Sequence, residues 1–91
     1  MSATAAGPMT VRVTVADAWR TFALQAAVGE TAAALKLKAL GCARIDGAQA
    51  AGYEVKFGGA LVRDESQALS VLGVRNGASL VVLSRRRRPV R

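Results

Sequence analysis

The chain has 91 residues, of which 52% are apolar, and it carries a formal net charge of +7. This length fits one small domain with a single core, and it excludes a large catalytic cleft or a second domain. With one cysteine and no histidine, the sequence excludes an internal disulfide and offers neither a zinc ligand set nor a base to activate a cysteine nucleophile. We expect no catalytic residue, metal or cofactor.

Residues 1–9 predict a disordered leader. They are small and polar, include Gly7 and Pro8, and lack the basic and apolar regions of a secretory signal. No apolar run in the sequence approaches the ~20 residues of a membrane span. These features favour a cytoplasmic protein.

Residues 10–26 predict a β-hairpin. Valines alternate with polar residues over 11–15, which is typical of a strand with one buried face, and the alternation resumes over 22–26. The break between the two runs contains Trp19 and lacks an Asn-Gly or Asp-Gly pair. We therefore expect a loose turn rather than a two-residue one.

The stretch GETAAALKLKALG, residues 29–41, changes to helical spacing. Thr31 is suited to cap the start of a helix and Gly41 to cap its end. Lys36 and Lys38 are expected to point away from the core.

The remaining segments predict a loop, three strands and a helical turn. Cys42 opens the loop and is expected to be a small buried or half-buried residue. In YEVKF the alternation turns Glu54 and Lys56 outward. The later elements are expected at residues 60–62 (short strand), 69–74 (helical turn) and 79–83 (last strand).

In this order the elements predict an α+β fold over residues 10–84, with a mixed sheet of four to five strands packed on one helix. The first and last strands are expected to pair in parallel at the centre of the sheet. This is the simplest way for one amphipathic helix to bury its apolar stripe against so small a sheet.

Three stretches resemble the ubiquitin-like β-grasp family: GETAAALKLKAL, FGGALVRDESQALSVLGV and RNGASLVVL. The resemblance covers Thr10 to about Arg85 and implies a ubiquitin-like protein-interaction module without enzymatic activity. It also implies that Trp19, Lys56, Val81 and Leu83 lie on a partner-binding face with Arg12. Apolar anchors among basic groups suit a protein partner with an acidic surface. We expect this protein to bind such a partner as a monomer. The alternative for Trp19 is that it folds back over the end of the hairpin.

The chain departs from the family where its modifiers and sulfur carriers end in Gly-Gly, because it ends in Arg88-Pro89-Val90-Arg91. The resemblance therefore implies a non-covalent role, with a covalent modifier as an alternative that requires unusual tail processing. A further alternative is an accessory domain of bacterial type VII secretion, whose ubiquitin-like proteins also lack Gly-Gly.

Residues 85–91 predict a flexible basic tail that supplies five of the seven net positive charges. Binding of nucleic acid through this tail is an alternative function, but no aromatic residues are interleaved with the arginines. The loop carboxylates are expected to be solvated charges rather than an acid–base pair. The tail arginines are Arg85, Arg86, Arg87, Arg88 and Arg91, and the loop carboxylates are Glu30, Asp46, Asp64 and Glu65.

Overall fold

A computed structural model describes residues 9–85 of the chain. This part of the protein has the predicted α+β architecture, with five strands, one main helix and three short helical turns. In chain order the elements are β1 (Met9–Val15), η2 (Ala16–Ala18), β2 (Arg20–Ala26), α1 (Ala32–Cys42), η3 (Gly47–Gly52), β3 (Tyr53–Phe57), β4 (Ala60–Leu61), α2 (Leu69–Leu72) and β5 (Ser79–Ser84).

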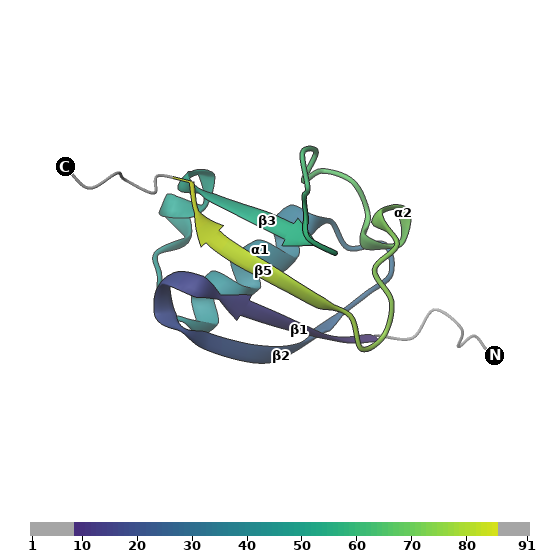
Figure 1. The fold of residues 1–91 in the computed structure, drawn as a ribbon, viewed down its shortest axis with the longest axis horizontal. Coiled ribbons are helices and arrows are strands. Elements are labelled where there is room, and N and C mark those ends of the chain that lie inside the picture. Colours follow the sequence, from purple (N-terminus) through teal and green to yellow (C-terminus); the bar gives the residue numbers. More distant parts are fainter. Residues whose placement is uncertain (1–8, 86–91) are drawn as a thin grey trace.

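The strands form one mixed sheet in the order β2-β1-β5-β3-β4 (Figure 1). The central strands β1 and β5 are parallel, with Val13 opposite Leu80 and Val15 opposite Val82. β2 and β3 flank this pair in antiparallel orientation, and β4 adds two residues at one edge. The predicted central pairing of the first and last strands is confirmed.

The core lies between one face of this sheet and α1, which crosses behind the strands in Figure 1. The alternating valines of β1 are fully buried at positions 11, 13 and 15, because side chains along a strand point to opposite faces in turn. α1 contributes Leu35 and Leu40, which are at most 2% exposed. Burial of each such side chain stabilises the fold by about 1.5–3 kcal/mol. With the inner face fixed by the core, the intervening side chains of every strand must face outward.

The start of α1 agrees with the prediction, but its end does not. Thr31 caps the start by accepting the Ala34 N–H at 3.1 Å. Gly41 was expected to end the helix, yet it lies inside α1. The helix instead ends in a Schellman motif, in which the N–H of Ile45 donates to the carbonyl of Leu40 at 2.8 Å.

Arg44 occupies the left-handed position of this motif, with φ of 64°. Its N–H donates to the Gly41 carbonyl at 3.0 Å, which is the second hydrogen bond of a Schellman motif. The position that usually holds glycine thus holds an arginine. Ile45, the next residue, packs against the core, and this contact sets where the helix ends.

The prediction that Lys36 points away from the core is wrong. Lys36 is only 5% exposed, because it lies on the buried stripe of α1 one turn before Leu40. Its Nζ lies 2.6 Å from Glu65 Oε1 and donates to the Tyr53 carbonyl at 3.0 Å. Glu65 is therefore a partner of a buried cation, and its expected role as a solvated loop charge is also wrong.

Glu30 is likewise not a solvated charge. Its carboxylate pairs with Lys38 at 3.0 Å and accepts the Ala27 N–H at 3.2 Å, so it secures the loop before α1. Asp46 and Asp64 are exposed, as expected, and each closes a local turn by accepting a backbone N–H two residues on. The Ser66 hydroxyl and then the Ser66 backbone N–H lower the pKa of Asp64 by donating hydrogen bonds to its carboxylate.

Three boundaries differ from the sequence prediction. Met9, assigned to the leader, is the first residue of β1 and is 5% exposed. Cys42, expected to be at least half-buried, is the exposed last residue of α1. The loop after it contains the helical turn η3.

Candidate interaction surface

The face of the sheet turned away from α1 is the candidate surface, here called the outer face. Strand register defines its members, because each is paired with a residue of the same orientation on the neighbouring strand. Hydroxyl groups of Thr14 and Thr21 meet across β1 and β2 at 2.8 Å, as two side chains on one side of a sheet must. The outer face comprises Thr10, Arg12, Thr14, Thr21, Ala23, Gln25, Glu54, Lys56, Leu61, Ser79, Val81 and Leu83.

Four residues that the sequence proposes for partner binding lie on this face. Val81 is 36% exposed on the central strand β5, directly opposite Lys56 of β3. Leu83 follows on the same side of β5 and is half-buried. Arg12, on β1, is exposed and lies opposite Ser79.

Trp19, the fifth proposed residue, lies in the β1–β2 turn rather than on a strand. Its N–H donates to the Ala16 carbonyl at 3.1 Å, and its backbone takes the left-handed conformation with φ of 53°. The side chain is 88% exposed, more than any other large apolar side chain in residues 9–85. It therefore does not fold back over the hairpin end.

The turn that carries Trp19 adjoins the end of β5. The Ser84 N–H donates to Asp17 Oδ1 at 3.4 Å, which joins the turn to the strand one residue beyond Leu83. The β1–β2 turn and the C-terminal end of β5 consequently lie at the same end of the sheet (Figure 1).

Two further members of the outer face bear on the site, although the sequence did not propose them for binding. Leu61 is 41% exposed and pairs with Lys56, so it extends the apolar surface to the β4 edge. Glu54 pairs with Leu83 and is the one carboxylate on the outer face. The alternation in YEVKF turned Glu54 outward, whereas nothing in the two-residue strand β4 indicated the orientation of Leu61.

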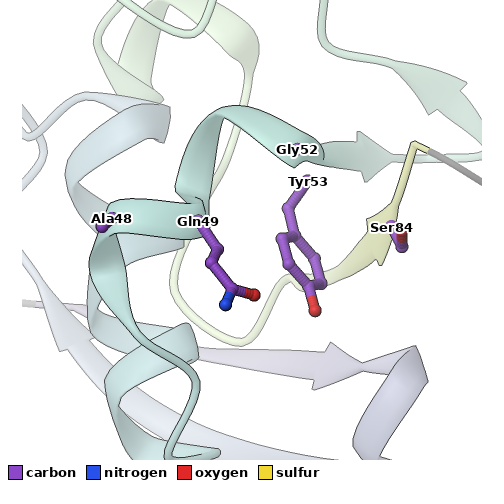
Figure 2. Close-up of a pocket in the computed structure, with 5 residues that line it drawn as sticks. All are labelled: Ala48, Gln49, Gly52, Tyr53 and Ser84. Carbon is purple, nitrogen blue, oxygen red and sulfur yellow. The ribbon is translucent and has the colours of Figure 1, made fainter.

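A shallow cavity of about 380 Å³ borders the Trp19 end of the sheet. Figure 2 shows the side chains of Gln49 and Tyr53 extending in the same direction beside Ser84. Burial raises the pKa of the Tyr53 phenol. The negative charge of Asp17 and the hydrogen bond between Tyr53 and Asp17 raise this pKa further. The remaining lining residues are Ala48 and Gly52. The hydrogen-bonding side chains that line the cavity, those of Gln49, Tyr53 and Ser84, carry no formal charge.

A second cavity, of about 360 Å³, lies at the β4 edge of the sheet, beside α2. Phe57, Leu61 and Leu72 give it an apolar lining, and Arg63 and Asp64 lie at its margin. Leu61 is the one lining residue that also belongs to the outer face.

Arg85 is the last residue described, and its N–H donates to the Gly52 carbonyl at 2.8 Å. The other predicted tail residues, Arg86, Arg87, Arg88 and Arg91, lie outside the described range, as does the leader up to position 8. Between residues 9 and 85 no three potential ligand side chains gather as a metal site would require. In the same range, no helix has the length and apolar character needed to cross a membrane.

No protein-family model and no curated protein matches this sequence. Solved structures do match its fold. Ubiquitin from Caldiarchaeum subterraneum is 20% identical with a TM-score of 0.74, over 92% of this chain and 98% of that one. A ubiquitin-like domain of an Arabidopsis thaliana protein is 18% identical with a TM-score of 0.76, over 99% and 90%. The ubiquitin-like domain of Plasmodium falciparum Dsk2 is 18% identical with a TM-score of 0.70, over 85% and 97%.

These likenesses and the strand order establish a ubiquitin-like β-grasp fold, which confirms the predicted fold class. At such identities the comparison concerns the fold alone.

Proposed function

We propose that this chain is a non-enzymatic ubiquitin-like module that binds a protein partner non-covalently through the outer face of its sheet. Trp19, Val81 and Leu83 are the apolar anchors, and Arg12 and Lys56 are the basic groups beside them. The protein acts as a monomer in this proposal. Its cytoplasmic location stays a prediction of the sequence.

Trp19 is the observation that carries the proposal. A bulky side chain in the left-handed conformation costs about 1–2 kcal/mol relative to an ordinary backbone angle. At 88% exposure the indole recovers little of that cost by packing in the free protein. Tryptophan is a residue enriched at interface hot spots, where burial by a partner supplies the missing stabilisation.

The charges of the outer face support a partner with acidic groups around an apolar centre. Arg12 and Lys56 outnumber the one carboxylate, Glu54, and Arg85 extends the basic character past the end of β5. Positive groups around apolar anchors speed association with an acidic surface and set its orientation. The fold likeness to ubiquitin and to ubiquitin-like domains is consistent with such a role as an analogy between folds.

The test is capture of partners from native cell extract with the full chain, followed by measurement of Kd with the purified partner. Trp19→Ala should weaken that binding by at least about tenfold, as expected for a hot-spot residue, and Leu83→Asp should abolish it. Val71→Ala is the matched control, because Val71 is an equally apolar, 68% exposed residue on α2, outside the sheet. The proposal fails if all three variants bind as the wild type does, or if the control is as damaging as Trp19→Ala.

Each alternative function has its own readout. A covalent modifier would appear in native cells as a truncated or conjugated mass. Nucleic-acid binding through the arginines would weaken steeply with salt, with a slope of about −3.6 for four neutralised phosphates, and would disappear on deletion of residues 85–91. A secretion accessory domain would be captured together with components of a membrane complex.

A further inference from the structure

The protein has three lysines, and the fold occupies the amines of two of them. Lys36 is buried against Glu65 and the Tyr53 carbonyl, at 2.6 and 3.0 Å. Lys38 is more exposed, but its Nζ donates to the Gln25 carbonyl at 2.6 Å and pairs with Glu30 at 3.0 Å. An electrophile can reach either nitrogen only after these contacts break.

Lys56 differs in that no acceptor in residues 9–85 lies within hydrogen-bonding or ion-pair distance of its amine. It lies on β3, beside the β4 edge of the outer face, with Val81 of β5 on one side and Leu61 of β4 on the other. These apolar neighbours cover the methylene stem of a half-buried lysine while its charged end extends to water. The remaining basic side chains of the chain are arginines, which stay protonated and do not compete as nucleophiles.

We infer that Lys56 is an acyl-acceptor site for an anionic activated acetyl donor of the acetyl-phosphate class. The ammonium first loses a proton to water, and the Nζ lone pair of the resulting amine attacks the carbonyl carbon. A C–N bond forms, and the bond between that carbon and the oxygen carried by phosphorus breaks. Inorganic phosphate leaves with the bonding electron pair, and the amine proton passes to water. Arg12, on the same face but two strands away, adds positive charge that attracts an anionic donor to the outer face.

The effect of Lys56 acetylation on partner binding rests on the proposed function. Acetylation removes the positive charge of Lys56 and leaves a neutral row from Val81 through the modified lysine to Leu61. An acidic partner is then bound more weakly, so the modification acts as a switch on that surface.

The experiment treats the full chain with acetyl phosphate and follows each lysine by peptide mass spectrometry, with the α-amino group measured separately. In the folded protein Lys56 should react at least about fivefold faster than Lys38, because charged hydrogen bonds must open at Lys38 first. Lys36 should remain unmodified over the same period. In urea the three rates should agree within about twofold, since the fold no longer holds any amine.

Two variants complete the test. Glu30→Gln, which keeps an acceptor for the backbone but removes the charge beside Lys38, should raise the Lys38 rate and leave that of Lys56 unchanged. Lys56→Arg should eliminate the fast reaction. The inference is overturned if Lys38 reacts as fast as Lys56 in the folded protein, or if the preference for Lys56 persists in urea. No partner enters this measurement, so failure of the proposed function would leave its result intact, and the reverse also holds.

Discussion

Replacement of Arg44 by glycine should stabilise this protein. Arg44 is exposed and holds the left-handed position that ends α1, with φ of 64°. The two hydrogen bonds of the Schellman motif are backbone bonds, so glycine would keep both. Glycine also adopts this conformation without a clash between Cβ and the backbone.

The magnitude follows from two opposing effects. Relief of the left-handed conformation should contribute about 1–2 kcal/mol. The greater freedom of glycine in the unfolded chain should cost about 0.5–1 kcal/mol. We therefore expect a net gain of about 0.5–1 kcal/mol, which corresponds to a rise in Tm of about 2–8 °C for a domain of this size.

Urea unfolding followed by far-ultraviolet circular dichroism measures the gain as a higher midpoint with an unchanged m-value. Arg44→Ala is the control, because it removes the same side chain but keeps the unfavourable φ, and its stability should stay within about 0.5 kcal/mol of the wild type. The reasoning is refuted if Arg44→Gly unfolds at a lower midpoint than the wild type, or if Arg44→Ala stabilises the protein equally.

Three further predictions concern stability and titration. Glu65→Ala should lower the free energy of unfolding by about 3 kcal/mol, because it leaves a buried ammonium unpaired, whereas Glu65→Leu combined with Lys36→Met should recover most of that loss; urea unfolding of both variants checks this. The phenol of Tyr53, the one tyrosine of the chain, should titrate by ultraviolet absorbance above its ordinary pKa of 10.0, and Asp17→Asn should lower the midpoint without restoring that value, since burial is the larger cause. Because the pKa is raised on folding, the contribution of Tyr53 to stability is complete below pH 10.0 and is lost as pH rises through the raised pKa. Gly41→Ala should stabilise the protein by about 0.5–1 kcal/mol in thermal unfolding, because Gly41 lies inside α1 with open space around a Cβ; an unchanged Tm would contradict its place in the helix.

The sheet was predictable because its information is local. Alternation over residues 11–15 and 79–83 sets the buried face of both central strands, and a one-residue shift of either would expose valines or leucines to water. The same alternation along the strands predicts that Lys56, Val81 and Leu83 lie together on the outer face. Their role in binding stays a proposal.

The errors arose where a residue depends on a partner distant in sequence. Nothing near Lys36 indicates that Glu65 will reach it from the loop before α2, so a lysine in a helix was assigned to solvent. The glycine at position 41 predicts a helix end, but α1 continues to Cys42, and Ile45 beyond it packs against the core. The exposure of Trp19 was likewise undecided, because it depends on how the β1–β2 turn meets the end of β5.

The parallel pair at the centre of the sheet has a mechanical consequence. Tension applied between Met9 and Ser84 pulls β1 and β5 in opposite directions along their common axis. All the hydrogen bonds between them are then loaded together instead of opening one after another as in a zipper. The domain should therefore resist stretching between these two points far better than stretching across the β3–β4 edge, where two residue pairs hold the strands.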